Sequence, residues 1–67
     1  MPQNNYGVYK ENEGGVIQWV TDLAPLTMGE AADALKWNEQ DAMNTASYLN
    51  GLGNGTYFIG HVPRPHV

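Results

Sequence analysis

Alternation of hydrophobic and polar side chains predicts two strands in the first third of the chain. Residues 6–9 (Tyr-Gly-Val-Tyr) are aromatic and β-branched, and residues 16–20 (Val-Ile-Gln-Trp-Val) alternate between two faces. The polar segment between them ends in two glycines, which suits the loop of a hairpin. On the second strand we expect Ile17 and Trp19 to face the core.

The spacing of hydrophobic residues then becomes helical, and two capping patterns accompany the change. Thr27 and Glu30 have the residue types and spacing of a capping box, and Asn38 followed by Asp41 resembles a second helix start. At the far end, Gly51 suits the left-handed position that closes many helices.

The length of this segment argues against one straight helix. A helix over residues 28–50 would be about 34 Å long, whereas short strands span about 17 Å. Half of its hydrophobic stripe would then lie beyond the sheet. We therefore predict two helices, over residues 28–37 and 39–50, or one helix bent sharply near Trp37.

A last strand is predicted over residues 56–62, because Pro63 ends regular pairing. The predicted fold class is α+β, with the element order β-β-α-α-β. It has a three-stranded antiparallel sheet of order 2-1-3, with a bent helix or helical hairpin on one face. We expect residues 1–62 to form a single domain and residues 63–67 to form an extended C-terminal tail.

The chain is acidic, with seven Asp and Glu against three Lys and Arg and a formal net charge of −4. Binding to the phosphates of a nucleic acid requires several cations on one face. We therefore expect no nucleic-acid partner. A protein partner, and a basic one in particular, fits this charge.

The composition does not point to catalysis, a cofactor or a metal. The absence of cysteine removes disulfides and thiolate zinc sites. The two histidines, His61 and His66, lie on the expected strand and tail, at a spacing unlike that of zinc sites. The N-terminal residues lack the regions of a signal peptide, and no run approaches the roughly 20 apolar residues of a membrane span. We expect a cytoplasmic, non-enzymatic protein without membrane contact.

Seven aromatic side chains are many for a domain of this size. Exposed tyrosine and tryptophan are typical of binding surfaces. Alternatively, these side chains cover a thin core and the second face of the sheet, or they are buried in a homodimer whose sheet faces pack together. The candidate interface comprises Tyr9, Trp19, Trp37, Tyr48 and Tyr57, with the acidic Glu39 and Asp41.

Part of the helical segment carries a familiar pattern, with small or hydrophobic residues at Ala31, Ala32, Leu35, Trp37, Ala42 and Leu49. This pattern resembles the helix-turn-helix of bacterial and phage regulators, which implies a DNA-binding transcriptional regulator. Lys36 stands where those proteins commonly have a glycine, and the exposed positions of the second helix carry no basic residue. Two packed helices unrelated to DNA fit the same pattern.

The whole chain has a second resemblance. A Tyr-Gly-Val-Tyr strand and a Trp-centred strand precede an Ala-rich helical segment, and the chain closes on a strand from Tyr57 to Pro63. This order resembles small proteins encoded by phages and prophages of Gram-positive bacteria. The resemblance implies an accessory protein of a mobile element in a bacterial host cell. Many such proteins block a host defence or replication protein, and anti-CRISPR proteins are one such class.

The expected function is therefore that of a small acidic protein-interaction module, acting as an inhibitor of a host nucleic-acid-binding protein. The alternative is a helix-turn-helix DNA-binding transcriptional regulator.

Overall fold

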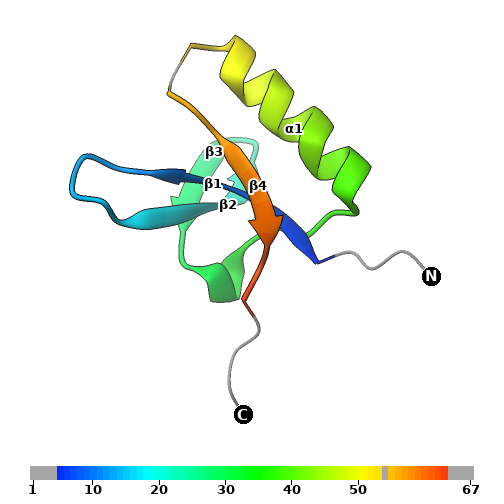
Figure 1. Cartoon of the computed structure of the whole chain (residues 1–67), viewed down its shortest axis with the longest axis horizontal. Helices are drawn as coiled ribbons and strands as arrows, with labels where there is room; N and C mark the ends of the chain where they lie inside the picture. The colour runs from blue at the N-terminus through cyan, green and yellow to red at the C-terminus, as the bar shows by residue number, and fades with distance from the viewer. Residues whose placement is uncertain (1–4, 54, 64–67) are drawn as a thin grey trace.

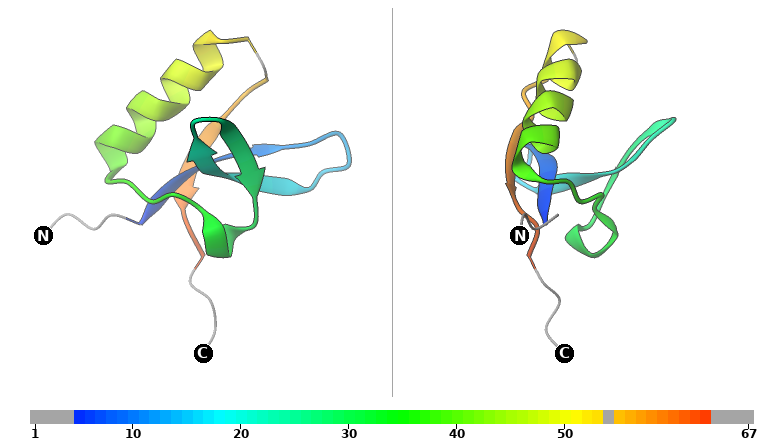
Figure 2. Two further views of the ribbon diagram at one scale, coloured as in Figure 1. Left: turned by 180° about the vertical axis from the view of Figure 1, so that it is seen from behind. Right: turned by 90° about the vertical axis from the view of Figure 1, so that its right-hand side faces the viewer.

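Four antiparallel strands and one α-helix form the fold of the computed structural model, which describes residues 5–53 and 55–63 (Figure 1). In chain order the elements are β1 (Tyr6–Glu11), β2 (Ile17–Leu23), β3 (Leu26–Gly29), the short 3-10 helix η1 (Ala31–Asp33), α1 (Glu39–Gly51) and β4 (Phe58–His61). The strand order in the sheet is β3-β2-β1-β4. The β1–β2 hairpin and α1 extend toward opposite sides of the molecule (Figure 1 and the left view of Figure 2).

The fold is α+β, but the predicted three-stranded sheet with two helices is wrong, because the sheet has four strands and a single α-helix covers it. Within this sheet the first, second and last strands lie in the order β2-β1-β4, which matches the predicted order 2-1-3. The error lies in residues 26–37, which form an extra strand and a 3-10 turn where a first helix was expected. The predicted tail over residues 63–67 lies outside the described residues, except for Pro63.

The extra strand forms because the chain turns back at Ala24-Pro25. Oδ1 of Asp22 accepts hydrogen bonds from the backbone N–H groups of Leu23 (2.7 Å) and Ala24 (3.3 Å), which closes the turn. β3 then pairs antiparallel with β2. This pairing satisfies backbone groups on the outer side of β2 and holds residues 26–29 in an extended conformation, so the predicted helix over residues 28–37 does not form.

The predicted capping box is also absent. The Thr27 hydroxyl donates a hydrogen bond to the carbonyl of Pro25 (3.1 Å) inside the turn. Glu30 precedes η1 and makes no side-chain capping hydrogen bond. The helix-turn-helix resemblance therefore lacks its first helix, and the DNA-binding alternative loses its structural basis.

The second predicted helix is confirmed as α1. Oδ1 of Asn38 accepts a hydrogen bond from the backbone N–H of Asp41 (2.8 Å), as expected of an N-cap. The buried residues Ala42, Ala46 and Leu49 form the predicted stripe. The C-terminal end differs from the prediction, because Gly51 is still helical and the left-handed residue is Gly53 (φ 78°).

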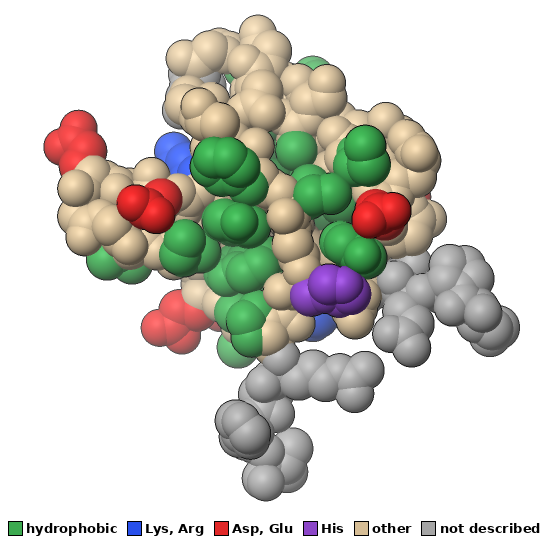
Figure 3. Space-filling model, in the orientation of Figure 1, with side chains coloured by type: hydrophobic (Ala, Val, Ile, Leu, Met, Phe, Trp, Pro, Cys, Tyr) green, Lys and Arg blue, Asp and Glu red, His purple; other side chains and the backbone are tan. Residues whose placement is uncertain are grey.

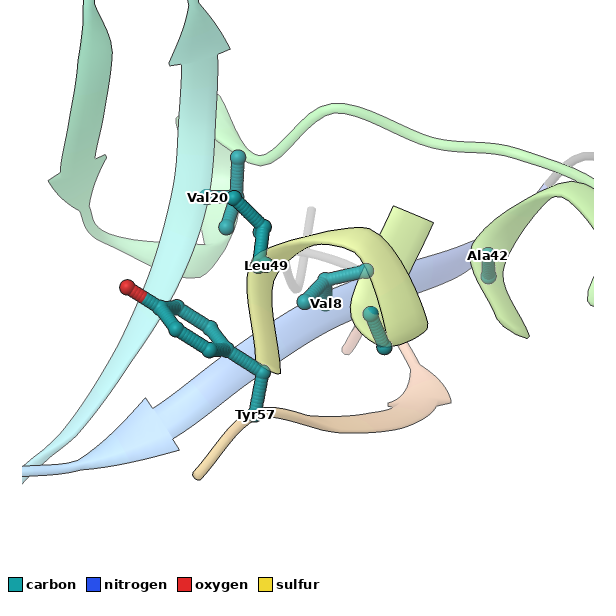
Figure 4. Close-up of a cluster of buried hydrophobic side chains, with 6 residues drawn as sticks. Val8, Val20, Ala42, Leu49 and Tyr57 are labelled. Carbon is teal, nitrogen blue, oxygen red and sulfur yellow. The ribbon is translucent and has the colours of Figure 1, made fainter. Parts of the chain in front are cut away.

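The main core lies between α1 and one face of the sheet. α1 stands over β1 and β4, while β2 and β3 turn away from it (Figure 2, right view). Figure 4 shows core side chains from the sheet, from α1 and from the residue before β4 pointing toward one another. The buried members are Val8, Val20, Ala42, Ala46, Leu49 and Tyr57.

A smaller cluster lies on the opposite face of the sheet. Trp19 packs there with Ala34 and Val62, while Ile17 remains exposed. The prediction that Ile17 and Trp19 face the core is therefore confirmed for Trp19, in this second cluster, and wrong for Ile17, while Val20 is the β2 residue of the main core. The cluster depends on Gly7, because a Cβ at this position would lie 2.6 Å from Cγ2 of Val62.

Candidate protein-interaction surface

A row of three aromatic side chains crosses the sheet on the face opposite α1. Tyr9 on β1 is the direct cross-strand partner of Trp19 on β2 and of Phe58 on β4. The ring centroids of Tyr9 and Trp19 are 5.0 Å apart, and those of Tyr9 and Phe58 are 5.7 Å apart. These distances are typical of favourable aromatic pairs. We call Trp19, Tyr9 and Phe58 the aromatic row.

One end of the aromatic row is exposed and the other is covered. Phe58 is 49% exposed, Tyr9 is partly buried, and Trp19 is only 8% exposed because the cluster around Ala34 covers it. Ile17 lies two residues before Trp19 on β2, on the same face of the sheet, and is 43% exposed. The surface that a partner can reach therefore centres on Phe58, Tyr9 and Ile17.

Acidic side chains border this apolar surface at its hairpin end. Glu11 is the cross-strand partner of Ile17, and Glu13 is exposed in the β1–β2 loop. Figure 3 shows hydrophobic side chains gathered across the middle of one face of the molecule, with acidic side chains on the hairpin side and another beside the hydrophobic side chains on the α1 side. An apolar centre with a charged rim is the arrangement of protein-binding surfaces.

A second apolar feature lies between α1 and β4. It is a groove of about 400 Å³. Its lining residues are Met43, Ala46, Ser47, Asn50, Tyr57 and Ile59. The groove therefore opens beside the last strand of the sheet, on the same face as the main core.

Among the members of the predicted interface, Tyr9 and Trp19 form a direct pair of aromatic rings. Tyr57 is 4% exposed in the main core, with Nζ of Lys10 5.4 Å from its ring centroid. Trp37 is partly buried against the same core, and its backbone exchanges hydrogen bonds with Tyr6. Tyr57 therefore offers almost no surface to a partner, whereas Trp37 stays partly exposed.

The remaining predicted interface residues lie on α1, away from the aromatic row. Tyr48 is 66% exposed, and Glu39 and Asp41 are exposed in the first turn of the helix. Sequence reasoning missed Phe58 as an interface residue. The alternation of the last strand, with Tyr57 buried and Phe58 on the other face, is the signal that could have found it.

Tyr6 and His61 are cross-strand partners at the N-terminal end of β1, with ring centroids 4.3 Å apart. Burial raises the pKa of the Tyr6 hydroxyl above its ordinary value, and the nearby negative charge of Glu39 raises it further. The Tyr6 hydroxyl therefore stays protonated at neutral pH and can donate a hydrogen bond.

Within residues 5–53 and 55–63, no three or more His, Asp or Glu side chains gather in a way that could hold a metal ion. His66 lies outside the described residues. None of the helices in the described part of the chain is long and apolar enough to span a bilayer. The chain matches no known family model, no curated protein and no solved structure.

Proposed function

We propose that this chain is a non-enzymatic protein-interaction module that contacts a basic partner protein through the aromatic row. The observation that carries the proposal is the continuous contact of Trp19, Tyr9 and Phe58 across three strands, ending in a half-exposed Phe58. Rigid aromatic side chains in such a row provide a large contact area at a small cost in conformational entropy.

The charge of the chain supports a basic partner. The seven acidic residues outnumber the three basic ones, and Glu11 and Glu13 lie beside the exposed part of the row. Arginine side chains of a partner can stack on the rings of Tyr9 and Phe58 while their charge meets these carboxylates. A nucleic acid would instead meet a surface of its own charge.

This chemistry fits an inhibitor of a host nucleic-acid-binding protein. The surfaces that such proteins present to phosphates are basic and often contain exposed arginine. An acidic module with an apolar centre would compete with nucleic acid for that surface. The proposed setting is the cytoplasm of a bacterial cell that carries a phage or prophage, where the module would act as an anti-CRISPR or another counter-defence protein.

The test compares Phe58→Ser with Tyr48→Ser, because both replace an exposed aromatic residue but only Phe58 belongs to the row. Each tagged variant captures proteins from a Gram-positive host lysate, and each captured protein is purified for titration. We expect the wild type and Tyr48→Ser to bind one protein and displace nucleic acid from it. Phe58→Ser should bind it at least tenfold more weakly. Equal binding by both variants would contradict the proposal.

Self-association stays a prediction in the form that the sequence suggested, with sheet faces packed together. The aromatic row cannot be covered by a second copy and by a host protein at once. A homodimer compatible with the proposed function therefore requires a different contact surface.

A further inference from the structure

β4 is an edge strand, and part of its backbone has no hydrogen-bond partner among residues 5–53 and 55–63. The sheet ends at β4, and the strand lies at the margin of the molecule in the right view of Figure 2. The backbone N–H of Val62 donates a hydrogen bond to the carbonyl of Asn5 (2.8 Å). The backbone N–H and C=O of Val62 therefore point toward the β1 side of the strand. Since antiparallel pairs alternate, the groups of Phe58 and Gly60 also point toward β1. The backbone N–H and C=O groups of Tyr57, Ile59 and His61 therefore point away from β1, toward the open edge of the sheet.

Asn50 already occupies one of the outward positions. Its Oδ1 accepts a hydrogen bond from the backbone N–H of Tyr57 (2.7 Å), and its Nδ2 donates to the carbonyl of Tyr57 (3.3 Å). No described residue makes such bonds to the outward groups of Ile59 and His61. The open part of the edge is therefore the segment from Ile59 to His61.

This edge strand is short, with four residues, but it lacks the other features that usually prevent strand pairing. Natural edge strands carry lysine, proline, inward-pointing charges or bulges. β4 contains Phe58, Ile59, Gly60 and His61, and its pairing with β1 has no register shift. The other edge strand, β3, follows Pro25 and pairs with β2 through an irregularity between Val20 and Asp22.

We propose that two copies of this chain pair antiparallel through their β4 edges, with a two-fold axis at Gly60. In this register Ile59 of each copy lies opposite His61 of the other, and each such pair exchanges both of its outward backbone hydrogen bonds. The same patch serves both copies, as a two-fold interface requires. The result is one continuous sheet that contains the strands of both copies.

The position of α1 fits this arrangement. α1 contacts β1 and β4 to a similar extent, so we take its axis to lie midway between them, half a strand spacing from β4. The distance between the two α1 axes is then this half spacing, plus one spacing between the two β4 strands, plus the half spacing in the second copy. The sum is about two strand spacings. With about 4.8 Å between strands this is roughly 10 Å, and helices pack at about 8–10 Å. The two helices would then contact each other above the new strand pair.

The groove beside β4 would be closed by this contact. Met43 is 50% exposed at the groove, and Ala46, Ser47 and Ile59 lie beside it. The second copy would bring its own Met43 and β4 side chains to this apolar surface. Burial of methionine and aliphatic groups from both copies would add a hydrophobic contribution to the backbone pairing.

The charge distribution is compatible with a second copy at this edge. Each copy carries a net charge of −4, so most approaches bring carboxylates together. Neither β4 nor the groove lining contains an Asp or Glu. Glu39 lies close to Tyr6, the cross-strand partner of His61, so one carboxylate of each copy stands near the end of this edge.

The dimer goes beyond the proposed function and leaves the aromatic row free. Phe58 points to the face of the sheet opposite the helices. In the proposed register the Phe58 side chains of both copies lie on that same face. Pairing therefore joins two aromatic rows into one larger surface for the partner.

The test is sedimentation equilibrium of the purified chain, with Met43→Lys and Tyr48→Lys as a matched pair. Both changes place a lysine on an exposed face of α1, but only Met43 lines the groove. We expect the wild type and Tyr48→Lys to form dimers that dissociate on dilution. Met43→Lys should stay monomeric while its circular dichroism matches that of the wild type. A wild type that is monomeric at millimolar concentration, or a Met43→Lys variant that dimerises as well as Tyr48→Lys, would overturn the proposal.

Amide hydrogen exchange of the wild type tests the same edge without a variant. The amides of Ile59 and His61 should exchange more slowly as concentration rises, and those of β3 should not change. Protection confined to β3, or no change at Ile59 and His61 in a dimer, would also overturn the proposal. A monomeric result would leave the host-protein contact standing, because that contact is tested separately through Phe58.

Discussion

The side-chain amide of Asn50 hydrogen-bonds to both backbone groups of Tyr57, in the way that a residue of a neighbouring strand would. The contact connects the last turn of α1 to the residue that precedes β4. It fixes Tyr57 with its ring in the main core and thereby places Phe58 on the opposite face. The contact holds the residue next to Phe58 in place, while the register between β1 and β4 puts Phe58 beside Tyr9.

Replacing Asn50 by alanine should destabilise the fold. The partly buried N–H and carbonyl of Tyr57 lose their partner, which costs about 1–3 kcal/mol. Asn44→Ala is the matched control, because it gives the same gain in helix propensity but removes only an exposed side-chain contact with Gln40. Urea unfolding of the two variants measures the difference. Equal unfolding free energies would contradict this role of Asn50.

Replacing Gly7 by alanine should destabilise the cluster around Trp19. The added methyl would lie 2.6 Å from Cγ2 of Val62 and 2.8 Å from Cε3 of Trp19. Overpacking of this kind costs about 1–3 kcal/mol. Since about 1 kcal/mol shifts the Tm of a small domain by roughly 4–8 °C, thermal unfolding detects the effect.

Gly51→Ala is the control for that substitution. Gly51 is helical, and a methyl group added there would meet nothing within 4 Å, so alanine should stabilise α1 by about 0.5–1 kcal/mol. Opposite signs for the two Gly→Ala changes are the expected result. A Tm for Gly7→Ala at or above that of the wild type would contradict the close contact at Gly7.

Glu39→Gln should lower the pKa of Tyr6. Burial is the larger cause of the raised pKa and persists in the variant, so only the part due to the Glu39 charge disappears. Absorbance titration of tyrosinate measures this change, with Tyr6→Phe identifying the Tyr6 contribution. Asp41→Asn removes a charge from the same helix turn and should leave the Tyr6 pKa higher than Glu39→Gln does.

The raised pKa of Tyr6 also sets the sign of the alkaline stability change. Tyr6 loses its proton more readily in the unfolded chain than in the folded one. Its contribution to stability is therefore complete below the ordinary value of 10.0 and is lost as pH rises through the folded pKa. Unfolding in urea above pH 10 should show a smaller loss of stability for Tyr6→Phe than for the wild type.

Local signals in the sequence correctly indicated the elements that depend on neighbouring residues. Asn38 and Asp41 form the predicted helix start, and the first, second and last strands overlap the predicted ranges, although the second extends to Leu23 and the last is confined to Phe58–His61. Each of these signals acts over a few residues. They can therefore be recognised without knowing which distant segments of the chain meet.

The errors concern contacts between distant segments. Thr27 and Glu30 have the pattern of a capping box, but the pairing of β3 with β2 holds Thr27 in a strand instead. The position of Phe58 beside Tyr9 follows from the register between β1 and β4, the first and last strands of the chain, which no local pattern specifies. The aromatic row was therefore predicted only in part, through Tyr9 and Trp19.

The most direct test of the proposed contact is site-specific photo-crosslinking in host cells, with a benzoyl-phenylalanine at position 58 or at position 48. Both positions are exposed aromatic residues, so the probe replaces a similar side chain in each. We expect position 58, and not position 48, to give a covalent product with another protein that is heavier than two copies of the chain. A product with nucleic acid at position 58, or a protein product at position 48 alone, would contradict the proposed role of the aromatic row.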